Sequence, residues 1–210
     1  IDIFCGSGGF FVFSMDHVFK KIRSERDSES EILENQKDYA SNNVFGMDFD
    51  PIIAKVAKAY MLIWGDGRSN ICIGDGLNDA NWSDDTRAKF QVKDDNGKRV
   101  FRKFDIIATN PPFAGDISAD DTLQKYELAY KNTNGKNKKI NKVSRDILFV
   151  ERCINSLSPK GRMAIVLPRG ILKNYNDERV RRFILKHAKI RAVVSLSGEM
   201  FKPFTNTKTC

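Results

Sequence analysis

The sequence predicts an α/β fold in which a mostly parallel sheet is covered by helices on both faces. Short apolar runs alternate along the chain with longer segments of helical character, a pattern typical of βαβ units. Each run ends in glycine, acidic or proline residues, where a strand would meet a loop. With 210 residues, of which 41% are hydrophobic and 30% charged, the chain is long enough to bury the core that such a fold needs.

The individual elements follow from the same patterns. The Asp50-Pro51 pair predicts a helix start, with Asp50 as the N-cap and proline at the first helical position. A hairpin is expected over 90–102, around the turn signal DDNG, and a long connection over 114–145. We expect strands at 1–5, 44–48, 69–73, 104–109, 162–167 and 190–196, and helices at 10–21, 31–42, 51–64, 146–156 and 177–187.

Composition and charge argue against several classes of protein. No apolar run approaches the ~18 residues of a membrane span, and no signal peptide is visible. The four cysteines form no CxxC pair, which argues against a zinc site and a disulfide framework. We therefore expect no metal and a cytoplasmic location. The net charge of +8 favours a polyanionic partner such as nucleic acid.

Three strand ends suggest a nucleoside site. Ligands of parallel sheets bind beyond the carboxyl ends of the strands, and FCGSGGF (4–10), GMDFDP (46–51) and GDGL (74–77) each end a predicted strand. The glycine turn lets a ligand touch the backbone, although its spacing matches neither GxGxxG nor a P-loop. Asp48 can accept both hydroxyls of a ribose, and Asp75 an exocyclic amino group of a purine. The alternatives are a tight turn, an exposed turn acid and an Asx turn.

The fourth strand end, FDIIATNPPF at 104–113, is stopped by two prolines, which fix their own φ and donate no hydrogen bond. The side-chain carbonyl of Asn110 and the main-chain carbonyl of Pro111 can hold one amino group by both of its protons. The prolines keep these acceptors preorganised. Phe113 offers a face on which a base can stack. The alternative is a strand-terminating turn with a packed Phe113.

Together these motifs resemble the adenine-N6 DNA methyltransferases, and more narrowly the modification (M) subunit of type I restriction–modification systems. The resemblance rests on DIFCGSGGF, GMDFDP, GDGL and FDIIATNPPF, followed by GRMAIVLPRGIL and VRRFILKHAKIRAVVSL, in this order over nearly the whole chain. It implies a Rossmann-like S-adenosylmethionine-dependent methyltransferase fold. It also implies direct methyl transfer from S-adenosylmethionine to N6 of an adenine flipped out of double-stranded DNA.

The resemblance also assigns roles to individual residues. The methionine part of the cofactor would be surrounded by Asp2, Cys5, Gly6, Ser7, Gly8 and Gly9. Asp48 would bind the ribose hydroxyls, and Phe49 would pack on the cofactor's adenine. Asp75 would accept from the amino group of that adenine, with Gly76 and Leu77 beside it. The target adenine would be received by Asn110, Pro111, Pro112 and Phe113.

A basic stretch follows the catalytic motif. Residues 131–145, KNTNGKNKKINKVSR, hold six basic side chains, no acid and no apolar periodicity. On the resemblance, we expect four lysines to contact DNA phosphates near the flipped base: Lys136, Lys138, Lys139 and Lys142. The alternative is a solvated loop.

The sequence departs from the family pattern in three respects. Ile3-Phe4 stands where the family usually has Pro-Ala, and neither an upstream cofactor-covering element nor a target-recognition region is recognisable. We therefore expect 1–210 to be a catalytic domain taken from a longer protein, with a specificity subunit and a restriction subunit as partners. The alternatives are a methyltransferase of the same fold that acts on RNA guanine N2 or protein glutamine, and a non-catalytic DNA-binding subunit. The loop spacing disfavours a nicotinamide-dependent dehydrogenase.

Overall fold

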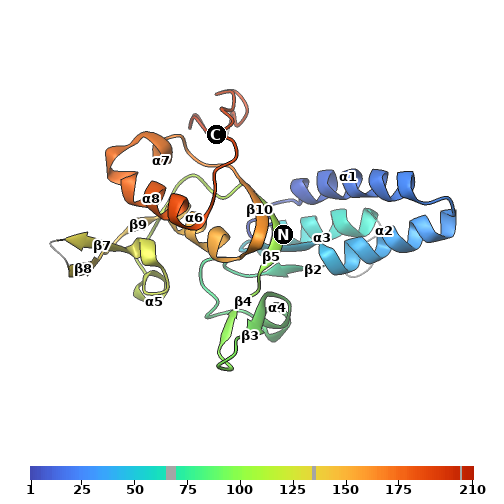
Figure 1. Ribbon diagram of the computed structural model, residues 1–210, viewed down its shortest axis with the longest axis horizontal. Helices are drawn as coiled ribbons and strands as arrows, with labels where there is room; N and C mark the ends of the chain where they lie inside the picture. Colours follow the sequence, from blue (N-terminus) through green and yellow to red (C-terminus); the bar gives the residue numbers. More distant parts are fainter. Residues whose placement is uncertain (65–69, 134–135, 204) are drawn as a thin grey trace. The chain divides into compact units, whose positions relative to one another are not determined.

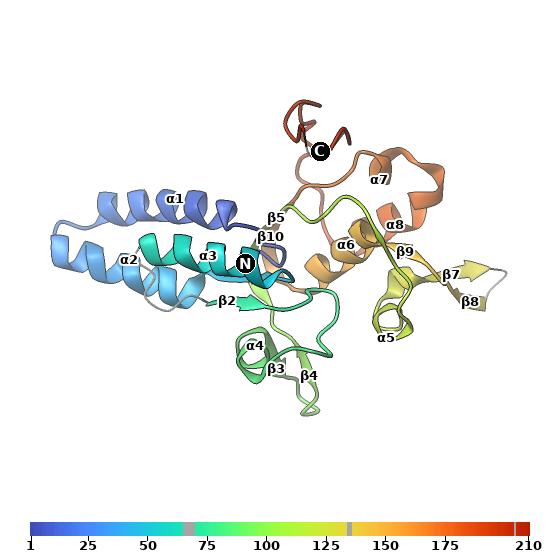
Figure 2. The ribbon, with the colours of Figure 1, turned by 180° about the vertical axis from the view of Figure 1, so that it is seen from behind.

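The computed structural model describes residues 1–64, 70–133, 136–203 and 205–210. Ser69, which the sequence assigns to a strand, lies outside the described residues. The chain forms two compact units, Ile1–Arg102 and Lys103–Cys210, which we call unit 1 and unit 2. Each unit has its own parallel strand pair, and its elements can be followed in Figure 1 and, from behind, in Figure 2.

Unit 1 is built on short parallel strands. Its elements are α1 (Gly9–Glu25), α2 (Glu29–Asn43), β1 (Phe45–Asp48), α3 (Pro51–Ile63), β2 (Asn70–Ile73), α4 (Asp84–Phe90), β3 (Gln91–Lys93) and β4 (Arg99–Phe101). β1 pairs in parallel with β2, and Asp2 bridges Gly46 in parallel on the other side of β1. The strand expected at 1–5 is thus reduced to one bridge followed by a turn. The expected hairpin is confirmed as the antiparallel pair β3–β4.

The start of α3 is confirmed in detail. Asp50 caps the helix, because its Oδ1 accepts from the backbone N–H groups of Ile52 (2.7 Å) and Ile53 (3.2 Å). Pro51 occupies the first helical position, where a missing N–H costs nothing. The cap therefore fixes the point at which the chain leaves β1 and turns into α3.

The core of unit 1 lies where α1, α2 and α3, which run side by side in Figures 1 and 2, meet the strands. Gly46 in β1 allows this packing. A Cβ on Gly46 would lie 2.5 Å from Cδ1 of Ile71 and 2.5 Å from Cζ of Phe11. Both of those side chains are buried, so glycine lets the first turns of α1 approach β1 closely.

Unit 2 combines a parallel strand pair with helices, short antiparallel strands and 3₁₀ turns. These are β5 (Phe104–Thr109), β6 (Asp116–Ile117), α5 (Asp120–Leu123), the 3₁₀ turn η1 (Glu127–Ala129), β7 (Tyr130–Thr133), β8 (Lys136–Lys139), β9 (Val143–Ser144), α6 (Arg145–Asn155), β10 (Leu157–Ile165), α7 (Gly170–Lys173), the 3₁₀ turn η2 (Tyr175–Asp177) and α8 (Glu178–His187). β5 pairs in parallel with β10, whereas β6–β9 and β7–β8 are antiparallel.

Two expectations for unit 2 need correction. The connection over 114–145 contains two strand pairs, and its basic stretch forms the β7–β8 hairpin. The strand expected over 190–196 is wrong: this segment carries no strand, and its one described backbone bond runs from the Leu196 N–H to the Thr209 carbonyl (3.1 Å). Apolar β-branched residues do not form a strand without a neighbour to pair with.

A buried carboxylate ties the 3₁₀ turn η1 to α6. Glu151 is 2% exposed, and it accepts from the N–H groups of Glu127 (2.7 Å) and Leu128 (2.7 Å). Arg179 of α8 donates to the Leu128 carbonyl. The segment that leads into β7 is therefore fastened to both α6 and α8.

We expect Glu151→Gln to lower the free energy of unfolding by about 1–3 kcal/mol, because an amide can accept only one of the two N–H bonds. Burial raises the pKa of the Glu151 carboxyl above its ordinary 4.5. The folded state then binds the proton more readily than the unfolded state, so stability falls as the pH rises from that value through the raised pKa. The difference in free energy of unfolding between the original protein and Glu151→Gln should therefore shrink as the pH rises. Urea unfolding at several pH values measures this difference, and a difference that grows with pH would contradict the expectation.

None of the helices in the described part of the chain is long and apolar enough to cross a bilayer.

Candidate functional site

The three strand ends predicted to form a nucleoside site lie together in unit 1. The segment at Asp2, β1 and β2 run parallel, so their carboxyl ends share one edge. The Cys5 N–H donates to the Met47 carbonyl (2.9 Å), and the Gly74 N–H donates to the Asp48 carbonyl (2.9 Å). These bonds fasten the glycine turn and the loop after β2 to the end of β1.

The glycine turn needs glycine at two of its positions. Gly6 and Gly8 have φ of 53° and 90°, in the left-handed region that other residues avoid. A Cβ on Gly8 would also lie 3.4 Å from Cδ2 of Phe11. Gly9 has no such constraint, because a Cβ there meets nothing within 4 Å among the described residues. A tight turn thus explains glycine at positions 6 and 8, while the start of α1 at Gly9 is open to a ligand.

We expect Gly8→Ala to lower the free energy of unfolding by about 1–2 kcal/mol, because alanine resists the left-handed conformation. The neighbouring change Gly9→Ala is the matched control. It should leave the stability unchanged or raise it by up to about 1 kcal/mol. Urea unfolding of the two variants measures the difference, and equal effects would show that the turn geometry does not distinguish these glycines.

Asp48 sits at the centre of this edge. Its Oδ2 accepts from the Gly6 N–H (2.9 Å) and its Oδ1 from the Asp50 N–H (2.9 Å). Each carboxylate oxygen has a second lone-pair direction, so Asp48 can hold the glycine turn and still accept from a hydroxyl. Phe49 follows directly and is 74% exposed, which leaves its ring accessible to a planar base.

Asp75 stabilises the loop after β2 by accepting hydrogen bonds. Its Oδ1 accepts from the Leu77 N–H (2.9 Å) in an Asx turn, and its main-chain carbonyl accepts from the Trp82 Nε1–H (2.9 Å). Gly76 permits a close approach, since a Cβ there would lie 2.6 Å from Cγ2 of Ile3. The motifs did not point to Trp82. A lone tryptophan in a polar stretch is nevertheless typical of a buried anchor.

Asp2 and Cys5 lie in the interior beneath this edge. They are 2% and 5% exposed, respectively, and Asp2 accepts from the Phe4 N–H (3.0 Å). Burial, followed by the charges of Asp2 and Asp48, raises the pKa of the Cys5 thiol far above its ordinary range. A buried neutral thiol is a poor nucleophile, so Cys5 can serve the site through its backbone.

This edge of unit 1 fits a nucleoside that carries positive charge. Three carboxylates lie in or beneath it, at Asp2, Asp48 and Asp75, and negative charge favours a bound cation. Ser7 is exposed in the glycine turn, and Phe49 supplies an accessible ring. S-adenosylmethionine combines an adenosine with a sulfonium and an ammonium group, which matches this set of carboxylates and the exposed ring. Within the described ranges, no group of three or more His, Cys, Asp or Glu side chains could hold a metal ion.

The Asn-Pro-Pro-Phe segment follows β5 in unit 2. Asn110 is exposed and Pro111 is buried, while Pro112 is exposed again. The Phe113 ring is half-buried and meets the ring of Phe201 edge-on, with centroids 5.2 Å apart and planes at 83°. Such T-shaped pairs are favourable. Phe201 therefore packs against the ring that ends the Asn-Pro-Pro-Phe segment, a contact that no motif in the sequence had indicated.

The four lysines expected to contact DNA divide into two kinds. Lys136 and Lys138 are exposed on β8. Lys139 is ion-paired with Asp120. The Nζ of Lys142 lies 2.8 Å from Oδ2 of Asp116.

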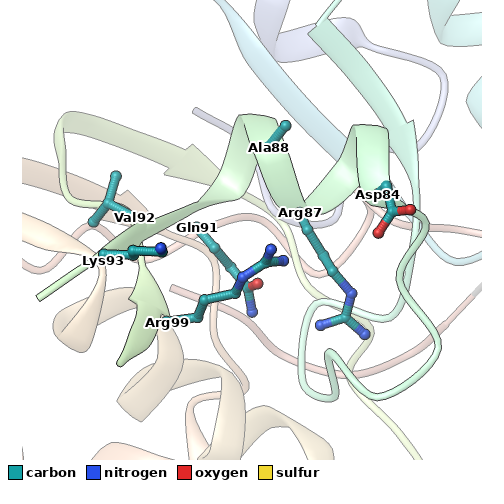
Figure 3. A pocket seen from close by; sticks show the side chains of 7 residues that line it. All are labelled: Asp84, Arg87, Ala88, Gln91, Val92, Lys93 and Arg99. Carbon is teal, nitrogen blue, oxygen red and sulfur yellow. The ribbon is translucent and has the colours of Figure 1, made fainter. Parts of the chain in front are cut away.

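A cavity of about 290 Å³ lies elsewhere in unit 1, on α4 and the β3–β4 hairpin (Figure 3). It is lined by Asp84, Arg87, Ala88, Gln91, Val92, Lys93 and Arg99. Arg87 has a structural task there, because it donates from Nε to the Trp82 carbonyl (3.1 Å) and from Nη2 to the Asp79 carbonyl (2.7 Å). It thereby supports the loop that carries Asp75. None of the predicted site residues lines this cavity.

Comparison with known proteins agrees with the motifs. The chain is 25% identical to the methylase subunit of the type I restriction enzyme EcoEI from Escherichia coli, over all of this chain and 36% of that protein. It is 24% identical to the MjaIX methylase subunit of a type I restriction enzyme from Methanocaldococcus jannaschii, over 94% of this chain and 30% of that protein. The solved M protein of the type I restriction enzyme EcoKI shares the fold, with a TM-score of 0.66 at 20% identity, over 99% of this chain and 37% of that one.

The chain spans between 18% and 36% of the length of the curated relatives that it matches. A family model described as N-6 DNA Methylase matches residues 1–210, the whole of the chain. The resemblance predicted from the four strand-end motifs is thereby confirmed, and the chain belongs to the N-6 DNA Methylase family.

Proposed function

We propose that the protein containing this chain transfers a methyl group from S-adenosylmethionine to N6 of adenine in DNA, as the modification subunit of a type I restriction–modification system. The observation that carries the proposal is the Asn-Pro-Pro-Phe segment that begins with the exposed Asn110 directly after β5, in a chain of this family. The fold proposed with it is one Rossmann-like, mostly parallel sheet with helices on both faces.

The edge of unit 1 would hold the cofactor. When bound, S-adenosylmethionine supplies a methyl group that an amine can accept directly. The glycine turn from Gly6 to Gly9, with Ser7 exposed in it, would line the methionine part. Asp48 would accept from the ribose hydroxyls, and Phe49 would pack on the adenine. Asp75, beside Gly76 and Leu77, would accept from the adenine amino group. Asp2 and Cys5, which are buried, would support this surface from below.

Asn110 and Pro111 would hold the target adenine by its amino group. Hydrogen bonds from both N6–H groups to the two carbonyl acceptors would favour a tetrahedral nitrogen. This nitrogen could accept the methyl group as the bond between the methyl carbon and the sulfonium sulfur breaks, and its surplus proton would then pass to solvent. Pro111 and Pro112 restrict the backbone, so that little reorganisation remains for the reaction itself. Phe113, with Phe201 edge-on against it, would stack the flipped base.

The partners belong to the same proposal. The methylase subunits similar to this chain are subunits of type I restriction enzymes by their names. We infer that a specificity subunit and a restriction subunit assemble with the full-length protein, that duplex DNA is its substrate, and that it works in the cytoplasm. Contacts of Lys136 and Lys138 with DNA phosphates are likewise proposed, whereas Lys139 and Lys142, which the sequence placed among these contacts, are ion-paired with Asp120 and Asp116.

Transfer of a labelled methyl group from S-adenosylmethionine tests the substrate class. The full-length protein, alone and with its specificity subunit, is offered duplex DNA, structured RNA and a glutamine-containing protein in parallel. Labelling of DNA alone is expected. Labelling of RNA or protein would favour the rival methyltransferases with a similar motif, and cofactor binding without any transfer would favour a non-catalytic subunit.

A further inference from the structure

The β7–β8 hairpin of unit 2 carries lysines on both of its faces. In an antiparallel hairpin, residues directly opposite each other share a face, as do residues two apart on one strand. The register places Lys131 opposite Lys138, and Tyr130 opposite Lys139. Lys131, Lys136 and Lys138 therefore share one face, which we call the lysine face, while Tyr130 and Lys139 lie on the other.

The two faces differ in their surroundings. The lysine face is exposed, whereas Tyr130 and Lys139 are half-buried. The other two lysines of the basic stretch 131–145 have acidic partners: Lys139 is ion-paired with Asp120, and Lys142 with Asp116 at 2.8 Å. In the part of the chain that the structure describes, no acidic side chain pairs with the lysine face. In both views the hairpin extends away from α6 and α8 (Figures 1 and 2).

The arrangement on the lysine face is unfavourable unless an anion binds there. Like charges directly opposite each other in a sheet repel, as the ammonium groups of Lys131 and Lys138 do. The spacing along β8 suits a polyanion: Lys136 and Lys138, two residues apart on an extended strand, are separated by about 6.8 Å. This is comparable to the separation of consecutive phosphates along one nucleic-acid strand. The face holds no aromatic ring for base stacking, so contacts to the backbone remain.

We propose that the lysine face binds the phosphate backbone of the DNA duplex, while Lys139 and Lys142 hold the hairpin on unit 2 through their ion pairs. The identity of the polyanion rests on the proposed function. The inference refines that function, because it adds Lys131 to the phosphate contacts and gives Lys139 and Lys142 a positioning role instead. Binding through this face is independent of base sequence.

The salt dependence of DNA binding tests the proposal in the full-length protein. Affinity for a short duplex is measured by fluorescence anisotropy over a range of KCl concentrations. Each phosphate contact contributes about 0.9 to the log–log slope, so the triple change Lys131→Gln, Lys136→Gln and Lys138→Gln should reduce it by up to about 2.7. The matched control replaces Lys20, Lys21 and Lys37, exposed on α1 and α2, with glutamine. It removes the same charge and should leave the slope unchanged.

A second variant separates binding from folding. Lys138→Glu places a carboxylate opposite Lys131, so the thermal midpoint should stay the same or rise while DNA affinity falls. An unchanged slope in the triple variant, or a loss equal to that of the control, overturns the proposal. So does Lys138→Glu if it lowers the midpoint and spares DNA binding.

Two further measurements distinguish a lysine face that does not bind DNA from a protein that does not methylate it. Affinity for S-adenosylmethionine should survive in the triple variant, because none of the residues proposed to hold the cofactor lies on the hairpin. Intact transfer with an unchanged slope would reject the lysine face alone. A reduced slope in a protein that transfers no methyl group to DNA would reject the proposed function and keep the hairpin as a polyanion-binding surface.

Discussion

Asn110→Ala should reduce methyl transfer by at least about 100- to 1000-fold, the typical effect of removing one preorganised group that stabilises developing charge. The side chain is exposed, so its removal should not unfold unit 2. Because Asn110 is expected to contact only the target base, affinity for S-adenosylmethionine should stay within a few-fold of the original. Single-turnover transfer and calorimetric titration of the cofactor measure the two effects separately.

Asn155→Ala is the matched control for this change, since Asn155 is another exposed asparagine of unit 2, at the end of α6. It should leave both transfer and cofactor affinity unchanged. Unimpaired turnover of Asn110→Ala would reject the role of its carbonyl as an acceptor for N6. A parallel loss of cofactor affinity would show that Asn110 acts on the cofactor rather than on the target base.

Asp48→Ala should weaken S-adenosylmethionine binding on the order of 100-fold or more. Hydrogen bonds to a charged group contribute about 1.5–3 kcal/mol each, and two ribose hydroxyls would lose their acceptor. The change also releases the N–H groups of Gly6 and Asp50, so some loss of stability is expected as well. Equilibrium cofactor binding at a temperature well below the unfolding midpoint isolates the first effect.

Asp50→Ala separates the two consequences. Asp50 also accepts two backbone N–H bonds, from Ile52 and Ile53, and losing such a cap costs about 1 kcal/mol. The Asp50→Ala variant should therefore lose about as much stability as the Asp48→Ala variant, while it retains its affinity for the cofactor. Equal losses of affinity in the two variants would show that local unfolding at the end of β1, and not a ribose contact, explains the result.

Much of unit 1 could be predicted because its signals are local. The Asp50 cap, the β3–β4 hairpin and the ends of β1 and β2 each depend on neighbouring residues, and the structure confirms them. Likewise, the glycines at positions 6 and 8 could be assigned to a turn, because a left-handed backbone conformation favours glycine over all other residues. Local signals of the same kind also identified the three site motifs, each at the end of its own predicted strand.

The parts that sequence reasoning missed depend on distant contacts. The segment 190–196 has the composition of a strand but lacks a paired neighbour, and pairing is not encoded within the segment itself. The anchor at Trp82 and the ring of Phe201 act on residues 7 and 88 positions away, at Asp75 and Phe113. The basic hairpin shows no apolar alternation, because one of its faces is covered only in part and the other carries lysines.

Mass spectrometry of nucleosides is the most direct test of adenine-N6 methylation. The full-length protein with its specificity subunit is incubated with duplex DNA and isotopically labelled S-adenosylmethionine, and the DNA is then digested to nucleosides. The label should appear in N6-methyladenine, and it should be absent from the parallel reaction with Asn110→Ala. Label in a methylated cytosine, or equal labelling of adenine by the Asn110 variant, would contradict the proposed chemistry.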